Sequence, residues 1–426
     1  MANPVRYSNE PPASSNGNYL HGASAAVLGW TLEAYEYFVL VFIVDALARD
    51  FHISKEAVIR TFIATLAMRP IGALLFGVLA DRYGRRIPML FMGAFFFVIA
   101  VLSGSCQNYP TFLFLRALYG IGMGGYWGVA ASLALESAPG RWRGVLSGVI
   151  QAGYPLGYLL AAMTARLMLP LWGWRPMYWV GTVPAIITMF LVYKAPESQK
   201  CAGKQFRNIE TVMPELWKQR WIFAYLVIAL ALMVSLSHGT QDLYPDFLKT
   251  QHRVSSNGTA DIAMLYSIGA ILGAIFVGHC SELFGRRKTI IGALGLCVLA
   301  IPAWAFGKSL FVLAAGSVVM QIGVSGAWGV MPAHLTELAP NSVRALFGGL
   351  AYQFGVLLGS PGSSIEYALK TGWGYGNALA IFESVVIATL VIVFWLGPEN
   401  KGKAFSDDRP IFDLEDAAIK PATEPA

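Results

Sequence analysis

Long apolar stretches recur along this chain of 426 residues and constrain its fold more than any other feature. Each is long enough to cross a bilayer as a helix, which takes about 20 residues. Only 13% of the residues are charged, about half the share in soluble globular proteins. We therefore predict an all-α integral membrane protein with twelve transmembrane helices. The stretches cover residues 24–47, 57–80, 88–106, 109–132, 144–168, 174–194, 222–247, 259–281, 289–306, 309–335, 346–368 and 375–396.

Polar segments predict how the chain is divided. We expect two six-helix bundles, a linker between them and a cytoplasmic tail at each end. The predicted bounds are 1–20 for the first tail, 21–195 for the first bundle, 196–220 for the linker, 221–397 for the second bundle and 398–426 for the last tail.

The distribution of basic residues predicts the orientation. Most of the 31 Lys and Arg residues fall in the tails, the linker and alternate loops. Because cytoplasmic loops carry an excess of Lys and Arg, both termini should face the cytoplasm, in a plasma membrane or a bacterial inner membrane. The same loops account for the net charge of +6, so no nucleic-acid partner is expected.

An internal repeat links the two predicted bundles. The segment Gly77–Arg86 returns as Gly278–Arg287, 201 residues later. The same offset carries Trp127 onto Trp328 and Glu136 onto Glu337. A repeat at one register across several features predicts two halves that arose by parallel duplication.

These segments resemble those of a known family. The loop Gly77–Arg86, the glycine-rich run Arg116–Gly125 and the Pro-Glu-Ser sequence at 196–198 resemble motifs of the major facilitator superfamily. The run Ser237–Asp242 resembles the seventh-helix signature of the lactate/monocarboxylate–proton symporters, which belong to the same branch as the sialate–proton symporters. Val234 stands where that signature has Asn, and Asp246 stands where it has Thr.

The resemblance implies a function. It predicts proton-coupled symport of a short monocarboxylate such as lactate or pyruvate, by alternating access in the major facilitator fold. A symporter of a larger organic acid, sialate or an aromatic acid, is the first alternative, and a drug–proton antiporter is the second. The expected partners are the bilayer, protons and the small carboxylate, and the protein is expected to function as a monomer.

Ionisable residues inside spans are expensive and therefore functional candidates. Arg116 is predicted to bind the substrate carboxylate, because a guanidinium can grip a carboxylate with two parallel hydrogen bonds. An ion pair with Glu33 or Glu36 is the alternative. His238 and Asp242 lie four residues apart and share a helix face, at a depth similar to that of Arg116. They are predicted to line the same site.

Three glutamines complete the predicted site. Gln241 is expected beside His238 on the seventh span, although the stripe could instead satisfy the helix interruption at Pro245. Gln151 and Gln353 occupy similar places in the fifth and eleventh spans and are predicted to contact the substrate or to bridge helices.

Glu33 and Glu36 are predicted to carry the proton, with Arg69 at a comparable depth. Burial raises the pKa of a carboxyl and a nearby arginine lowers it, so a carboxyl under both influences can bind and release a proton. Asp242 is the alternative carrier, and a permanent Glu–Arg structural pair is the alternative role.

Charged loop residues are predicted to form the gate. By resemblance to the superfamily, they latch the cytoplasmic gate through ion pairs, with a first set in the loop after the second span and a weaker set after the eighth. The members are Asp81, Arg85, Arg86, Glu282, Arg286 and Arg287.

The motifs of soluble and membrane enzymes are missing. The sequence contains no GxSxG, HExxH or P-loop pattern, and its four cysteines have no metal-ligand spacing. The protein is predicted not to be an enzyme and to need no cofactor or metal. Without an ATP site, an ion or substrate gradient should drive transport.

Overall fold

The structure is a computed structural model that describes residues 18–197, 214, 217–340 and 343–399, and all regular structure in them is helical. Most of the predicted tails and linker lies outside the described residues. The first half contains α1 Asn18–Asp50, α2 Lys55–Tyr83, α3 Arg86–Ser105, α4 Tyr109–Ser137, η1 Gly140–Trp142, α5 Arg143–Trp172 and α6 Arg175–Lys194. The second half contains α8 Arg220–Gln241, α9 Tyr244–Thr250, α10 Ser256–Phe284, α11 Arg286–Phe306, α12 Leu310–Leu338, α13 Arg344–Gly359, α14 Gly362–Trp373 and α15 Tyr375–Leu396.

Ten helical stretches of the described residues are long and apolar enough to cross a membrane. They correspond to ten of the twelve predicted spans. The other two predicted spans are α4, which is 29 residues long, and 346–368, which is divided between α13 and α14. The all-α membrane architecture is therefore confirmed.

Two predicted spans are interrupted. The seventh breaks between α8 and α9, and Pro245 lies in the first turn of α9, where its missing N–H is tolerated. The eleventh breaks between α13 and α14, where Pro361 precedes the new helix.

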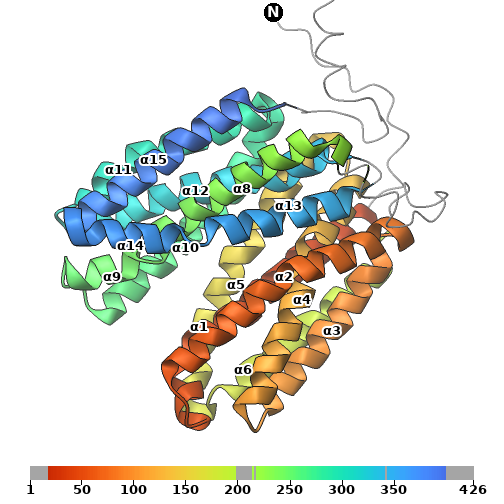
Figure 1. The fold of residues 1–426 in the computed structure, drawn as a ribbon, viewed down its shortest axis with the longest axis horizontal. Helices are drawn as coiled ribbons and strands as arrows, with labels where there is room; N and C mark the ends of the chain where they lie inside the picture. Colours follow the sequence, from red (N-terminus) through yellow and green to blue (C-terminus); the bar gives the residue numbers. More distant parts are fainter. Residues whose placement is uncertain (1–17, 198–213, 215–216, 341–342, 400–426) are drawn as a thin grey trace, which may run out of the picture.

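The helices form two bundles with the same packing order (Figure 1). In the first half α1 packs on α5, α2 on α4 and α3 on α6, and in the second half α8 packs on α13, α10 on α12 and α11 on α15. The second set follows from the first when each helix is replaced by its repeat partner. This is the arrangement that the 201-residue repeat predicts.

Glycines bring α4 against α2. A Cβ at Gly120 would lie 2.1 Å from the carbonyl oxygen of Thr65, and one at Gly124 would lie 1.8 Å from that of Arg69. No other residue allows backbones this close. This contact fixes the position of Arg69 relative to α4.

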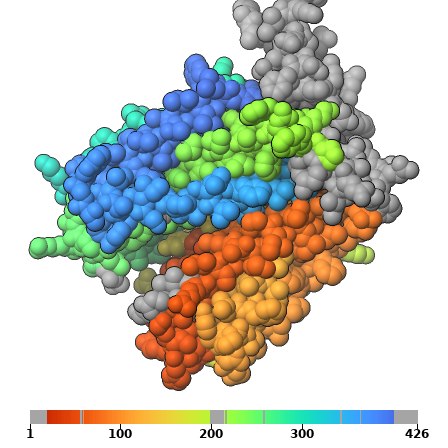
Figure 2. All heavy atoms as spheres, viewed as in Figure 1, coloured from red at the N-terminus to blue at the C-terminus, as the bar shows by residue number. Residues whose placement is uncertain are grey.

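The two bundles meet at one end, which we call the latch end. There α2 and α10 end while α5 and α13 begin, and the contacts across the halves pair α2 and α4 with α13 and α5 with α10 and α12. The bundles diverge toward the opposite end, where α9 and α14 lie (Figure 1). Figure 2 shows a surface hollowed between them on that side. Among the described residues, the two halves are thus in contact at the latch end and separated at the opposite end.

Candidate functional site

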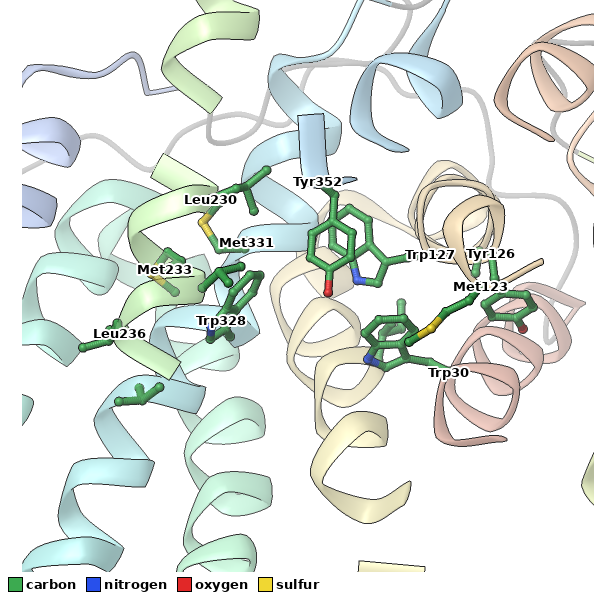
Figure 3. Close-up of a cluster of buried hydrophobic side chains, with 14 of the residues drawn as sticks. Trp30, Met123, Tyr126, Trp127, Leu230, Met233, Leu236, Trp328, Met331 and Tyr352 are labelled. Atoms are coloured by element: carbon green, nitrogen blue, oxygen red, sulfur yellow. The ribbon is translucent and has the colours of Figure 1, made fainter. Parts of the chain in front are cut away.

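Four aromatic side chains meet at the boundary between the halves, and we call them the aromatic floor (Figure 3). Trp30 and Trp127 come from the first half, and Trp328 and Tyr352 from the second. The ring of Tyr352 stacks on that of Trp127, with 4.6 Å between the ring centroids. It also makes edge-to-face contacts with Trp328 and Trp30, with centroid distances of 6.1 and 6.3 Å. The floor therefore joins both halves below the hollow.

Arg69 on α2 lies over this floor. Its guanidinium carbon is 5.5 Å from the ring centroid of Tyr352, and it also interacts electrostatically with Glu33. The side chain is buried, yet Nε and Nη2 have no hydrogen-bond partner among the described residues. Unpaired buried donors are costly, so an anion that accepted from them would stabilise this arrangement.

His238 and Asp242 lie at the end of α8, facing the hollow. His238 Nδ1 is 3.0 Å from Asp242 Oδ2, and their side chains are 44% and 43% exposed. Arg69 acts electrostatically on His238, and both Arg69 and Asp242 act on Tyr37. The structure thus brings groups from α1, α2 and α8 to one solvent-accessible space.

Gln241 turns away from this pair. Its Nε2 donates to Gln321 Oε1 on α12 at 2.9 Å, and Gln321 Nε2 donates to Thr240 Oγ1 at 3.1 Å. Ser237, in contrast, accepts a hydrogen bond from Trp328 Nε1 at 2.6 Å. The signature segment is therefore tied to α12 on one side and to the aromatic floor on the other.

Gln151 and Gln353 brace the floor. Trp127 Nε1 donates to Gln151 Oε1 at 3.5 Å, and Gln353 Nε2 donates to the carbonyl oxygen of Gly124 at 3.1 Å. Gln353 Oε1 has no hydrogen-bond partner among the residues described. These contacts match the helix-bridging alternative, and a substrate contact by either residue stays a prediction.

Arg116 lies within the first bundle. Its Nη2 donates to Ser103 Oγ on α3 at 2.6 Å and lies 3.9 Å from Glu36 Oε2. Its guanidinium carbon is 4.6 Å from the ring centroid of Tyr119 and 4.8 Å from that of Tyr178 on α6. These contacts match the alternative of an ion pair with Glu36, and a substrate contact by Arg116 stays a prediction.

The two glutamates of α1 interact electrostatically with different arginines. Glu33 interacts with Arg69, and Glu36 with Arg116. Both side chains are completely buried, and none of their carboxyl oxygens accepts a hydrogen bond from a described residue. Their predicted role in proton coupling therefore concerns two separate places, one beside the floor and one deeper in the first bundle.

The last turn of α2 reaches across to the other half. Asp81 accepts hydrogen bonds from the backbone N–H groups of Ala345 and Leu346, at 3.2 and 2.9 Å, in the first turn of α13. Arg85 pairs with Asp81 at 2.9 Å. Glu136 bridges the halves as well, because it lies 2.9 Å from Arg344. A carboxylate at a helix N-terminus is stabilised by the helix dipole.

The second half repeats this arrangement. Glu282 accepts from the backbone N–H of Gly144, near the start of α5 in the first half. Arg286 pairs with Glu282 at 3.0 Å and with Glu337 at 2.7 Å. Each half therefore places an acid on a helix N-terminus of the other, at the end where the two halves meet.

Arg86 and Arg287 bind within their own halves. The backbone N–H of Arg86 donates to Glu197 and that of Arg287 to Glu399, at 3.3 and 2.9 Å. Their guanidinium groups donate to carbonyl oxygens at the ends of α6 and α15. They fix the ends of α2 and α10, which carry Asp81 and Glu282, and among the described residues these hydrogen bonds stay within one half.

Comparison with known proteins identifies the family. The family model described as "Major Facilitator Superfamily" matches residues 26–241 and 243–420. This chain belongs to the major facilitator superfamily. The predicted fold is confirmed, since the chain aligns with the solved structure of the proton:xylose symporter XylE with a TM-score of 0.75 and 20% identity, covering 93% of this chain and 99% of XylE.

Curated relatives of this superfamily member are transporters of organic acids and related compounds. It is 31% identical over 408 residues to a "Carboxylic acid transporter protein homolog" of Saccharomyces cerevisiae, covering 86% of this chain and 66% of that protein. It is 28% identical over 398 residues to a "Probable 4-methylmuconolactone transporter" of Cupriavidus pinatubonensis, covering 90% of this chain and 91% of that protein.

Several residues at the candidate site of this transporter could not be predicted from the sequence. Tyr352 and Gln321 carry no charge and sit in apolar spans, so no local pattern marks them. Trp328 is visible in the sequence only as the repeat partner of Trp127. The position of the two tryptophans in equivalent helices was the available signal, because equivalent positions in the halves face the same central space.

Proposed function

We propose that this transporter is a proton-coupled symporter that moves a short monocarboxylate, such as lactate or pyruvate, by alternating access. The match of Ser237–Asp242 to the monocarboxylate signature and the similarity to a carboxylic acid transporter homolog support a carboxylate substrate. The hollow above the aromatic floor is the substrate site of the proposal.

Two donor atoms of Arg69, Nε and Nη2, carry the proposal, because no described residue accepts a hydrogen bond from them. They are buried beside an aromatic ring, and an anion is the ligand that such donors bind most strongly. In the proposal a substrate carboxylate takes this position, while the exposed pair His238–Asp242 binds the hydroxyl or keto oxygen. Substrate thereby contacts both halves at once, which couples binding to their movement.

Proton coupling follows from the charge balance of the substrate. Moving one negative charge against a potential of 100 mV costs about 2.3 kcal/mol, and a proton carried along removes this cost. Glu33 beside Arg69 and Glu36 beside Arg116 are the proposed carriers. A carboxylate substrate that arrives at Arg69 competes with Glu33 for it, which favours a neutral, protonated Glu33 while substrate is bound.

The latch end is the cytoplasmic end in this proposal, as the basic loops predict. The described arrangement is then open to the outside, with both latches closed. Opening them while the bundles rock about the floor would release substrate and proton inside. The protein acts as a monomer, since one chain contains both halves and the whole site.

Uptake of labelled lactate into proteoliposomes under an imposed pH gradient tests the function. We expect accumulation that collapses when a protonophore is added. Arg69→Lys keeps the charge but removes one guanidinium hydrogen bond, about 1.5–3 kcal/mol, so lactate affinity should fall about ten- to hundredfold. If Arg69→Lys binds lactate with wild-type affinity, Arg69 does not bind the substrate carboxylate. If uptake by the wild type is independent of the pH gradient, the protein is not a proton symporter.

Glutamine variants test the proton carriers. In Glu33→Gln or Glu36→Gln, gradient-driven accumulation should be lost, whereas exchange of labelled for unlabelled lactate, which needs no net proton movement, should survive. If both variants still concentrate lactate, Asp242 becomes the carrier to test next.

Transport of an aromatic acid is the second candidate, and the aromatic floor favours it. Planar ligands stack on tryptophan and tyrosine rings, and Trp30, Trp127, Trp328 and Tyr352 offer four of them. Competition of labelled lactate by unlabelled pyruvate, benzoate, 4-hydroxybenzoate and sialate separates the two. Stronger competition by the benzoates than by pyruvate would favour the aromatic substrate.

A further inference from the structure

Two buried acids in the second half have no role in the site described above. Glu366 on α14 and Glu383 on α15 are completely buried. None of their four carboxyl oxygens has a hydrogen-bond partner in the described part of the chain. Unsatisfied carboxyl groups in a membrane interior are costly, so their presence calls for an explanation that packing does not supply.

Glu383 occupies a space left open by the signature helix. A Cβ at Gly239 of α8 would lie 2.0 Å from Glu383 Oε1. The absence of a side chain at Gly239 therefore lets the carboxyl of α15 lie directly against α8, one residue from His238. The seventh-helix signature thus provides room for this acid as well as side chains for the hollow.

Glu366 connects Glu383 with the hollow. It lies within electrostatic range of Glu383 on one side and of Asp242 on the other. α14 packs on both α15 and α8 (Figure 1). The Asp242 side chain is 43% exposed, so the three carboxyls run from the accessible hollow into the closed interior of the second bundle.

No cation neutralises the two glutamates within the described residues. The other titratable groups that face them are Asp242 with its partner His238 on α8, Cys297 on α11 and Tyr375 on α15. Lys370 of α14 is held by Asp246 at 3.2 Å. Two carboxylates without a cation cannot both remain ionised in an apolar interior.

We propose that Glu366 and Glu383 form a second proton-binding site, loaded from the hollow through Asp242. A proton passes from water to the Asp242 carboxylate, then to Glu366 and Glu383, and leaves by the reverse transfers. The ligand is the proton itself, and no electron moves. The proposal rests on the proposed proton symport, and it adds a carrier in the second half to the carriers on α1.

The ratio of protons to substrate tests the site. Purified full-length protein in liposomes is given labelled lactate while an internal dye reports proton entry. Glu366→Gln and Glu383→Gln should each carry about one proton fewer per lactate than the wild type. Asp261→Asn, which removes an exposed acid on α10, is the matched control and should keep the wild-type ratio.

The outcomes separate this site from the proposed function. Wild-type ratios in both glutamine variants would overturn the second site and leave symport standing. A wild type that moves lactate without protons would overturn both.

A measurement on the wild type covers the case in which the variants do not fold. Dicyclohexylcarbodiimide modifies protonated carboxyls in apolar surroundings, and mass spectrometry locates the modified residue. We expect modification of Glu366 or Glu383 that decreases as the pH rises. If neither is modified at any pH under conditions that modify Glu33, the second site is rejected.

Discussion

Substitution of Asp81 by Asn should weaken the latch in a calculable way. Asp81 accepts two backbone hydrogen bonds from the first turn of α13, across the interface, at 3.2 and 2.9 Å. Its ion pair with Arg85 stays within the first half and so contributes equally to both conformations. Only the two bonds to α13 are lost when the latch end opens.

The magnitude follows from the chemistry of the amide. Asn retains one oxygen that can accept a neutral hydrogen bond, but its NH₂ group faces the second N–H and cannot accept. A bond to a charged group is worth about 1.5–3 kcal/mol and a neutral one about 0.5–1.5 kcal/mol. The closed latch should lose about 3 kcal/mol, which shifts the equilibrium toward the open latch by about a hundredfold.

Spin labels across the diverging end measure this shift. Cysteines at the exposed positions Arg49 on α1 and Thr250 on α9 are labelled in a cysteine-free background, and their distance distribution is recorded. Because the halves rock about the floor, opening the latch should shorten that distance in Asp81→Asn. Glu282→Gln should act in the same direction, and Asp261→Asn should have no effect. Unchanged distributions in both latch variants would refute the reasoning.

Three further outcomes are expected. Gly124→Ala adds a Cβ 1.8 Å from the carbonyl oxygen of Arg69, so the temperature of thermal unfolding in detergent should fall by several degrees. The control Gly295→Ala has open space at its Cβ, so its unfolding temperature should not change. Arg116→Lys changes the group beside Glu36, a proposed proton carrier, whereas Arg69→Lys changes the proposed carboxylate site. Lactate affinity should therefore fall less in Arg116→Lys than in Arg69→Lys, and proton-driven accumulation should fall more. Equal loss of affinity in both would return Arg116 to the substrate site. Saturating lactate should protect His238→Cys from a thiol reagent added outside, and equal labelling with and without lactate would place it away from the site.

The sequence predicts what depends on composition and repetition. Twelve apolar stretches predict the membrane helices, and the register of Gly77–Arg86 with Gly278–Arg287 predicts the equivalence of the halves. Both follow from one-dimensional patterns, because hydrocarbon requires long apolar segments whatever their neighbours are. The acids and arginines of the latch were predicted in another way, from the resemblance of the segment Gly77–Arg86 and its repeat to a motif of the superfamily.

The direction of a side chain around its helix could not be predicted in this way. Counting residues along α4 gives the depth of Arg116, but not whether it faces the hollow or α3 and α6. Its contacts with Ser103 and Tyr178 answer that. In the same way the prediction of one continuous span over 346–368 missed the interruption before α14, which Pro361 marks in the sequence, and with it the burial of Glu366.

The latch residues recur in both halves, whereas the charged residues of the candidate site occur in one half. The latch residues recur at the 201-residue offset, since Asp81 corresponds to Glu282 and Arg85 to Arg286, and both acids bind helix N-termini across the interface. The charged residues inside the spans do not recur: Ala270 occupies the position of Arg69, and Ser317 that of Arg116. Two equivalent latches suit a gate that must release both halves together. A substrate with one carboxylate needs only one cation, and a second arginine opposite Arg69 would be left without a partner in the membrane interior.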